Sequence, residues 1–506
     1  MKTARLTVFA LLGILTAFHL ILPVIRVPFK LEIDYNEGWN AIFCQKAVSG
    51  EPIYNHHTEW ISVNYPPLSF YIIGASGRLL RDPLVAGRLV SLLSVLAIAL
   101  GVARFVAARS RDVFASAFAG CFCLGSFAAF ATHYVGMSDP QLLGHVFTMG
   151  ALIIYVLDES ILDKPGKLFI VAFLSSLGIL TKHTLVAVPL AITADVLFES
   201  RKKLLLWLAL GSATAAGLAL LSFLIEGGEM FAQILRFPRT FSPVKLLMAL
   251  GLFSLVNGFP LLAVLPWLRR AWKSRPVRLA GLYAGLGTLL GLCMAGGYGT
   301  DVNMFFDGLI GLSLLVGLFL SDADENRVPI FYRRGVMPVM IPAAMILALL
   351  CVTVLKFTPA DGRDEVRFRI WRPGILRVLQ RVQDETLRDA AFVRESEGPV
   401  ICDSLLLCFL SRQEFVLDTF FVREAVAKGR VDESGLMRLV DRGYFGVIQL
   451  EREIGVDNGG RGILAVVRKR ILAETLTENI KREVAAHYRV SRRSMNGVFY
   501  VPVSVD

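Results

Sequence analysis

The sequence predicts a polytopic α-helical membrane protein of about eleven transmembrane helices, followed by a C-terminal soluble α/β domain. Of its 506 residues 55% are hydrophobic and the mean hydropathy is +0.58, which is rare among soluble globular proteins. Many apolar runs have the length of about 20 residues that crosses a hydrocarbon layer of about 30 Å. After about residue 357 the charge rises and the apolar runs shorten, which indicates a second domain.

The membrane domain is predicted to cover residues 1–356 and the soluble domain residues 357–506. The first apolar run is interpreted as a retained helix, because it is too long for a signal peptide and lacks a small-residue cleavage site. The predicted spans are roughly 6–25, 84–107, 113–131, 140–157, 168–181, 184–200, 204–225, 246–267, 279–295, 303–320 and 336–355.

The positive charges of the short loops predict the orientation. Loops at one end of the spans hold 18 Lys and Arg residues, and those at the other end hold 9, spread over longer loops. Because cytoplasmic loops carry the excess of positive charge, the second set and the C-terminal domain are expected to be extracytoplasmic, at an inner (plasma) membrane. Residues 357–506 contain 24 basic and 22 acidic residues, so the net charge of +11 arises mostly in the membrane domain. The basicity therefore reports topology and gives no indication of a nucleic-acid partner.

The first external loop, about 28–83, is predicted to carry two short helices. The segment NEGWNAIFCQKAVSG has apolar residues at helical spacing and ends at Gly50, which is typical of an amphipathic helix in the membrane interface. The segment PPLSFYIIGASGRLL opens with prolines suited to a helix start but is too short to span. It is interpreted as a second interfacial or re-entrant helix.

The tail is predicted to be a small α/β domain. GPVICD, EFVLDT and FGVIQLE are expected to be strands, and VREAVAKG and ESGLMRLVDRG to be helices. The tail has no glycine-rich phosphate loop and no recognisable catalytic motif. Cys402 and Cys408 could meet in an oxidising compartment, but they are expected to stay free, because nothing else indicates a disulfide framework.

Two acids follow the first span, in the segment EIDYNEGWNA. Asp34 and Glu37 are three residues apart and share a face if this stretch is helical. A carboxylate near a hydrophobic surface can have a raised pKa and act as a general base. The alternative is that both are ordinary solvated acids of a loop.

Further polar residues are predicted at the same side of the membrane. Asp139, in HYVGMSDPQLLGH, could cap the fourth span or join Asp34 in a site. Lys182 and His183, in LTKHTLVAVPLA, interrupt an apolar hairpin. Lys182 could reach water or neutralise a phosphate at the membrane surface, and His183 is a neighbour in the same loop.

The remaining external candidates are polar residues of later loops and histidines. Tyr298 in GYGTDVNMFFD, with Asp301 and Asn303, offers further substrate contacts or is a plain loop residue. The same holds for Arg236, directly before FPRTFSP, and for Arg239 within that segment. Histidines and acids can bind Zn²⁺, but the external His56, His57 and His133 show no tight ligand spacing. The metal ligands are therefore left unassigned and a divalent metal stays open as a cofactor.

These segments together resemble bacterial membrane glycosyltransferases with the GT-C fold, related to protein O-mannosyltransferases and to the aminoarabinose transferase of lipid A. The resemblance rests on DYNEG in the first external loop, NYPPLSFY after it, SDP entering the fourth span and TKHTLVAVPLA. It covers about 1–355 and is strongest over the first 190 residues. Each motif alone is weak, and their order and placement give them their specificity.

The resemblance implies a polyprenyl-phosphate sugar donor in the outer leaflet and an extracytoplasmic acceptor (a lipid, glycan or protein). It matches Asp34 to the first-loop catalytic acid, Asp139 to a second acidic position and Lys182 to a contact of the donor phosphate. Glu37 matches this pattern more loosely. Tyr65, Pro66 and Pro67 are expected to shape the substrate cleft.

Two other classes compete with this interpretation. A secondary transporter or flippase would also use membrane charges, but its site would lie near the midplane on broken helices, often within inverted repeats. Here the notable charges are at the outer boundary, and no repeat is evident. A non-catalytic scaffold for the tail would need no acids at these positions.

Overall fold

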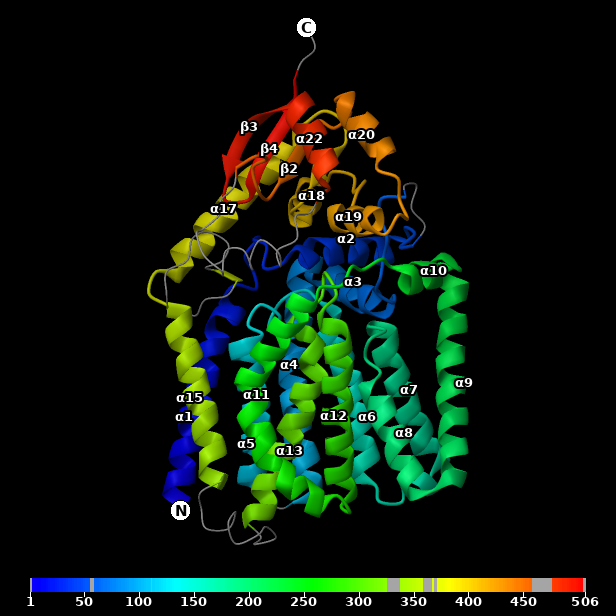
Figure 1. Cartoon of the computed structure of the whole chain (residues 1–506), viewed down its shortest axis with the longest axis vertical. Coiled ribbons are helices and arrows are strands. Elements are labelled where there is room, and N and C mark those ends of the chain that lie inside the picture. Colours follow the sequence, from blue (N-terminus) through cyan, green and yellow to red (C-terminus); the bar gives the residue numbers. More distant parts are fainter. Residues whose placement is uncertain are drawn as a thin grey trace.

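A computed structural model describes residues 2–54, 59–110, 112–324, 337–357, 366–367, 371–456 and 476–503. It shows a bundle of long helices with a smaller α/β domain stacked on one end (Figure 1). The N-terminus lies at the opposite end of the bundle, and the C-terminus lies at the far tip of the small domain. This architecture is the predicted one.

Each predicted span coincides with a helix of the bundle. Among the described residues, seven helices are long and apolar enough to cross a membrane. Three shorter apolar helices are Leu68–Leu80, Pro165–Thr181 and Met340–Val354, the first of which is not part of the bundle. The bundle consists of α1 (Lys2–Ile25), α4 (Pro83–Arg109), α5 (Val113–Phe130), α6 (Pro140–Leu157), α7 (Pro165–Thr181), α8 (Ala187–Glu199), α9 (Arg201–Glu226), α11 (Pro243–Ala271), α12 (Arg275–Ala295), α13 (Phe306–Asp324) and α15 (Met337–Phe357).

Helix starts at the boundary are set by aspartate–proline pairs. Asp82 precedes Pro83 and accepts hydrogen bonds from two free backbone N–H groups of α4. Asp139 precedes Pro140 and accepts one such hydrogen bond, from the Gln141 N–H at the start of α6. Proline suits the first helical position because it lacks an N–H group that would need a partner. These caps fix where two helices begin at the end that carries the small domain.

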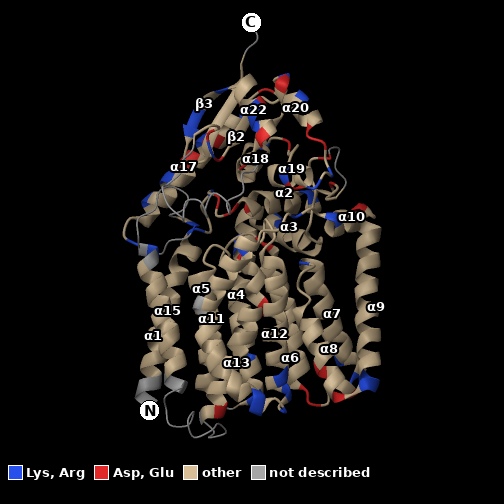
Figure 2. Cartoon of the chain, viewed as in Figure 1, with Lys and Arg blue, Asp and Glu red and all other residues tan. Residues whose placement is uncertain are grey.

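Charged residues are scarce along the bundle and gather at its ends (Figure 2). At the end away from the small domain, Asp195 of α8 is fully buried and pairs with Arg278 of α12 at 2.7 Å. Arg109 of α4 pairs with Asp322 of α13 at 3.0 Å. Such buried charges are tolerated because each is paired, and these pairs tie neighbouring helices together.

Both helices predicted for the first loop are present, between the bundle and the small domain. They are α2 (Tyr35–Ser49), which ends at Gly50 with φ 81°, and α3 (Leu68–Leu80). We expected α2 to lie in the membrane interface. Instead it packs against α3 and α4 on the bundle side and against α18 (Leu405–Ser411) of the small domain. Protein therefore covers the faces of α2 that the sequence pattern assigned to lipid and water.

The small domain is built on a four-stranded sheet of order β1-β2-β4-β3. β1 and β2 are parallel and the other neighbouring pairs are antiparallel, and β3 and β4 form a hairpin in which Ser494 pairs with Gly497. Helices precede, connect and flank the strands. The elements are α17 (Ile375–Arg394), β1 (Val400–Cys402), α18, α19 (Thr419–Ala427), α20 (Ser434–Asp441), β2 (Val447–Leu450), α22 (Glu478–His487), β3 (Tyr488–Ser494) and β4 (Gly497–Pro502).

Two expectations for this domain were wrong. The segment EFVLDT is not a strand, because it runs alongside the first loop, where the Asp418 N–H donates to the Trp60 carbonyl at 3.0 Å. Cys402 and Cys408 form a disulfide, with their Cα atoms 6.1 Å apart. The chain turns back from β1 into α18, which brings Cys408 over the end of the strand, and this distance is within the usual range for a disulfide.

Candidate active site

Asp34 lies at the start of α2, just beyond the end of α1. Its carboxylate accepts a 3.1 Å hydrogen bond from the Asn36 backbone and a 2.8 Å hydrogen bond from the Asn36 side-chain amide. Burial raises the pKa of Asp34 to about 6, against the opposing effect of Arg367 and His133 and with a further rise from Asp301. A carboxylate with this pKa is ionised at neutral pH and is basic enough to accept a proton.

Glu37 is one turn further along α2 and is completely buried. Arg88 of α4 donates to both of its oxygens, with Nε–Oε1 at 2.7 Å and Nη2–Oε2 at 2.6 Å. The backbone N–H groups of Ile33 and Ser138 also donate to Glu37, at 2.9 and 3.1 Å. Glu37 therefore ties α2 to α4 and to the loop before α6.

Asp139 and Lys182 meet at the same end of the bundle. Lys182 Nζ is 3.6 Å from Asp139 Oδ1, and both side chains are 4% exposed. The ammonium group also lies 4.8 Å from the centre of the Tyr65 ring. Burial lowers the pKa of Lys182, and Asp139 opposes that shift. The sequence predicted these three residues separately, and the structure brings them together.

His183 follows Lys182 and has an unsatisfied ring nitrogen. Among the described residues, its buried Nδ1 has no hydrogen-bond partner. Burial, together with the charges of Lys182 and Arg239, lowers the pKa of His183 to about 4, so the ring is neutral at pH 7. A buried polar atom without a partner costs about 1–3 kcal/mol, which a ligand that supplies a hydrogen bond would recover.

The loop after α10 (Glu229–Arg236) brings a second cation to the site. Arg239 Nη1 donates to the Tyr298 carbonyl at 2.7 Å, and its guanidinium lies 5.3 Å from the centre of the Phe237 ring. Arg236, expected to bind substrate, is instead exposed at the end of α10, where its carbonyl accepts a hydrogen bond from Arg430. Arg239, inside FPRTFSP, thus faces the site, whereas Arg236 before it does not, because the chain turns between the two residues.

Tyr298 and its neighbours close another side. The charged groups of Lys245 and Arg423 are each 5.3 Å from the centre of the Tyr298 ring. Nearby, His133 Nε2 and Asp301 Oδ2 are 2.7 Å apart. Burial raises the pKa of Asp301, but His133 beside it lowers that pKa, and the pKa is lowered overall. His133 is therefore held by an acid, and this pair adjoins the Asp34 carboxylate.

A small pocket joins these segments. Its walls come from α2 next to Asp34, residues 62–65, residues 237–239, Gly299 and the start of α19 in the small domain. The lining is aromatic and polar and includes Trp39, Asn64, Arg239 and Asp418. The pocket has a volume of only about 10 Å³, room for about one water molecule, so its lining marks where polar and aromatic side chains meet and not the outline of a bound substrate.

The other predicted residues have varied positions. Tyr65 lines the pocket. Pro66 and Pro67 are buried and do not line it, and the Pro67 carbonyl accepts the first backbone hydrogen bonds of α3. His56 and His57 lie outside the described residues.

Sequence reasoning missed residues for which weak signals exist. Arg88 is a charge near the start of an apolar span, and such a charge indicates a buried partner. Asp418 lies in EFVLDT, which was predicted to be a strand, but it is the cap of α19 in the structure, and Asp before a helix is a typical cap signal. That signal identifies the cap but gives no indication that the cap lines a pocket formed with residues far away in the chain.

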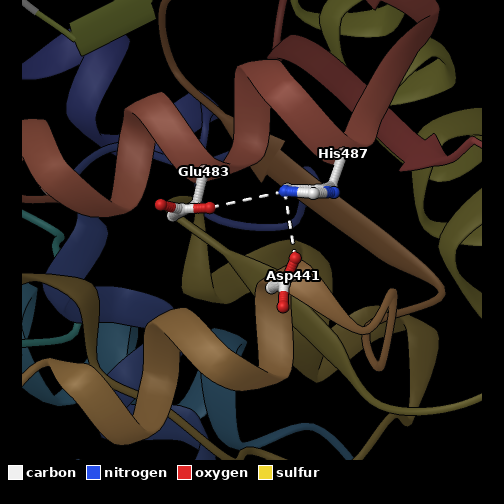
Figure 3. Close-up of side chains that lie close together, drawn as sticks. All are labelled: Asp441, Glu483 and His487. Carbon is white, nitrogen blue, oxygen red and sulfur yellow. Dashed lines mark ion pairs between the residues drawn. The ribbon is translucent and has the colours of Figure 1, made fainter.

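A separate cluster lies on the small domain, away from this pocket. Among the described residues, Asp441, Glu483 and His487 are the one group of three potential ligand side chains close enough to share a metal (Figure 3). His487 Nε2 is 3.1 Å from Asp441 and 3.4 Å from Glu483. The cluster is partly exposed and its ion pairs account for its geometry, so we assign it no role in catalysis.

Comparisons with known proteins place the fold. No protein-family model matches the chain, and no curated protein matches it in sequence. It is similar to the structure of ArnT from Cupriavidus metallidurans bound to undecaprenyl phosphate, with 16% identity, a TM-score of 0.55 and coverage of 97% of this chain and 98% of that one. The apo form of ArnT gives 15% identity, a TM-score of 0.58 and 97% coverage of both chains.

A second protein of known structure is similar over the whole of this chain. AglB, the oligosaccharyltransferase from Archaeoglobus fulgidus in complex with an inhibitory peptide and a dolichol-phosphate, is 12% identical, with a TM-score of 0.52. The match covers 100% of this chain and 75% of AglB. The likeness to both proteins therefore includes the bundle and the small domain.

Proposed function

We propose that this chain, which has the GT-C fold expected from its sequence, is a membrane glycosyltransferase that moves a sugar from a polyprenyl-phosphate donor to an extracytoplasmic acceptor. The observation that carries the proposal is the cluster of charged groups around Tyr65 at the end of the bundle, where the raised-pKa acid Asp34 lies near two cations, Lys182 and Arg239. The solved structures with undecaprenyl phosphate and dolichol-phosphate add support for a lipid-phosphate ligand.

In this proposal Asp34 is the general base. The acceptor hydroxyl gives its proton to the carboxylate as its oxygen attacks the anomeric carbon of the donor. The bond between that carbon and the phosphate oxygen breaks, and the polyprenyl phosphate leaves with the electron pair. A single displacement of this kind inverts the anomeric configuration. The partly buried position of Asp34 suits the role because it keeps the carboxylate basic near neutral pH while leaving it accessible.

The cations would bind the leaving phosphate. Lys182 and Arg239 lie near each other, because the charge of Arg239 lowers the pKa of Lys182 and both charges lower the pKa of His183. Arg can contact phosphate with two hydrogen bonds. We infer that Asp139 holds Lys182 in place and that Glu37 holds the loop through Arg88. His183 Nδ1 and Tyr298 are then candidate contacts of the donor.

A polar site at the end of the bundle favours a transferase over a transporter or flippase, whose site would lie near the midplane. The deciding experiment compares lipid extracts of a deletion strain and the wild type. We expect a sugar-linked polyprenyl phosphate to accumulate without the protein and to be consumed when the purified protein is supplied with an acceptor extract. No accumulation and no consumption would contradict the proposal.

The orientation gives a first prediction. The loop-charge bias and the Cys402–Cys408 disulfide, which persists in oxidising compartments, both support an extracytoplasmic small domain. A reporter fused after Asp506 that works only in the cytoplasm is expected to be inactive. The same reporter inserted at Ser200, the residue between α8 and α9, is expected to be active. The reverse pattern would invert the topology.

A second prediction concerns Lys182. Lys182→Ala is expected to weaken binding of undecaprenyl phosphate about 10- to 100-fold, because a charge-assisted hydrogen bond contributes about 1.5–3 kcal/mol. Binding to the purified protein can be measured by a change in intrinsic fluorescence. Lys428→Ala removes an exposed lysine outside the pocket and serves as the matched control. Equal affinity of the Lys182 variant and this control would remove Lys182 from the phosphate site.

A further inference from the structure

The loop that carries Asp34 is in direct contact with the small domain. Gly38 of α2 faces the first turn of α18 so closely that a Cβ atom built on it would lie 2.1 Å from the Leu406 nitrogen and 2.2 Å from the Leu405 carbonyl carbon. Such distances are far shorter than van der Waals contact. Gly38 therefore permits a backbone approach between the two helices that no other residue would allow.

Apolar packing extends this contact. Leu405 of α18 belongs to the same buried cluster as Trp39 and Phe43 of α2. The Phe43 ring also meets the Phe415 ring of the small domain edge to face, with centres 6.0 Å apart. The core under α2 is thus shared between the membrane domain and the small domain.

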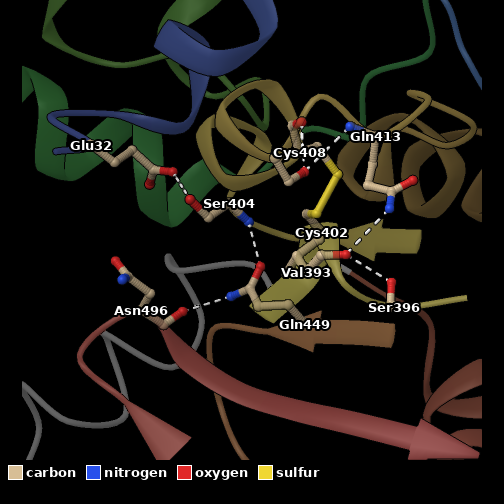
Figure 4. The surroundings of a disulfide bond; sticks show 10 residues. Glu32, Val393, Ser396, Cys402, Ser404, Cys408, Gln413, Gln449 and Asn496 are labelled. Atoms are coloured by element: carbon tan, nitrogen blue, oxygen red, sulfur yellow. Dashed lines mark hydrogen bonds between the residues drawn. A yellow bond between two sulfur atoms is a disulfide. The ribbon is translucent and has the colours of Figure 1, made fainter. Parts of the chain in front are cut away.

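A polar contact lies two residues before Asp34. Glu32 is buried and accepts a hydrogen bond from the Ser404 hydroxyl (Figure 4). It also pairs with Arg367 at 2.7 Å. Both of its oxygens thereby face residues that follow the last helix of the bundle. The Asp34 carboxylate is consequently flanked in the chain by Glu32 and Gly38, each of which is held by the C-terminal part.

The first turn of α18 is in turn fixed to the sheet. The Ser404 N–H donates to the Gln449 side chain of β2 at 2.9 Å, and that side chain donates to the Asn496 carbonyl at 2.6 Å (Figure 4). The Cys402–Cys408 disulfide ties the end of β1 to α18 over a separation of six residues. The surface presented to α2 is therefore braced by two strands and a covalent bond.

From these contacts we infer that the small domain is part of the catalytic unit, in which α18 is a positioning element that sets the place of Asp34. This inference rests on the proposed function, because it assigns a role toward the proposed general base. It adds that Gly38 and Ser404 act through Asp34 and touch no substrate.

Gly38→Ala tests the inference. The added methyl group must push α2 and α18 apart, and a displacement of about 1 Å at a catalytic group can lower a rate about 100-fold. Transfer is expected to fall about 10- to 100-fold. Gly217→Ala is the matched control, because a Cβ atom at this helical glycine of α9 has nothing within 4 Å.

The pH profile separates positioning from general loss of structure. The groups that face Asp34 are Arg367, His133 and Asp301, and burial raises its pKa to about 6. Exposure to water would lower that pKa toward the ordinary value of about 4. The acid limb of kcat/KM is therefore expected to move to lower pH in Gly38→Ala. A loss of activity with an unmoved acid limb would overturn the positioning role.

Amide hydrogen exchange provides a readout that needs no transfer activity. Peptides from α2 are expected to exchange faster in Gly38→Ala than in the wild type and in Gly217→Ala. Unchanged exchange would overturn the inference even if transfer fell. Absence of transfer in the wild type would instead contradict the proposed function, and exchange would still decide whether α18 holds α2. If Gly38→Ala does not fold, Ser404→Ala tests the same contact through the lost bond to Glu32.

Discussion

Replacing Asp34 by Asn is expected to lower sugar transfer about 10²–10⁴-fold, the usual contribution of a general base. Asn keeps the size of the side chain and can still cap α2 by accepting the hydrogen bond of the Asn36 backbone. Expression and membrane insertion should therefore be normal. The measurement is transfer from a lipid-linked sugar donor by equal amounts of purified wild-type and variant protein.

The pH dependence of the wild type provides a second check on Asp34. Its pKa is raised to about 6, so the carboxylate is the proton-accepting form above that pH and is lost as a base below it. We expect kcat/KM to be flat above about pH 7 and to fall tenfold per pH unit well below pH 6. Asp432→Asn, at an exposed aspartate of the small domain, is the control. Wild-type turnover in Asp34→Asn would show that the base lies elsewhere.

Asp139→Asn is expected to reduce transfer as well, by a different route. Asp139 is 3.6 Å from Lys182 and starts α6. Its loss would displace the lysine and leave proton transfer to Asp34 intact. The acid limb of the pH profile should therefore stay where it is in the wild type.

Breaking the Glu37–Arg88 pair is expected to have the largest effect on stability. Both side chains are fully buried and the contact is bidentate. Removing one partner leaves the other charge buried without compensation, which typically costs about 3–5 kcal/mol. Glu37→Gln should lower the free energy of unfolding by about this amount, measured by denaturation of the purified protein in detergent.

A double-mutant cycle provides the control. Arg88→Met should be at least as damaging, because Arg88 also donates to backbone carbonyls, including those of Phe29 at 2.7 Å and Leu31 at 2.6 Å. Glu37→Gln combined with Arg88→Met should cost much less than the sum of the two changes, because the pair is a single interaction. Additive losses would show that the residues act independently. Where Glu37→Gln remains folded, we expect it to retain more transfer activity than Asp34→Asn.

The sequence by itself determined the bundle and the end of it that carries the candidate site. Apolar length specifies the spans, because a chain in hydrocarbon must satisfy its backbone within each helix. The residues Asp34, Asp139 and Lys182 could be grouped in advance, because alternating spans bring their loops to the same side. Gly50 likewise predicted the end of α2, since its backbone has the left-handed conformation that favours glycine.

The sequence also contains a signal for the β3–β4 hairpin, which was not predicted. The hairpin of β3 and β4 contains Asn496–Gly497, and Asn-Gly between two strand-like runs is a strong turn signal. By contrast, EFVLDT is extended without joining the sheet, because its backbone partner is the first loop at Trp60. A short apolar run shows extension but cannot show which partner it has.

Only the tertiary structure decided which side chains meet across long separations. Glu37 pairs with Arg88, Arg239 faces the pocket in place of Arg236, and Asp418 lines a pocket whose other walls are far away in the chain. The disulfide and the contact at Gly38 likewise depend on how the small domain packs. The length of an apolar run and the charge of a loop are properties of one segment, so the sequence reveals them. Pairing within a packed interface depends on the relative placement of several elements, and no single segment encodes it.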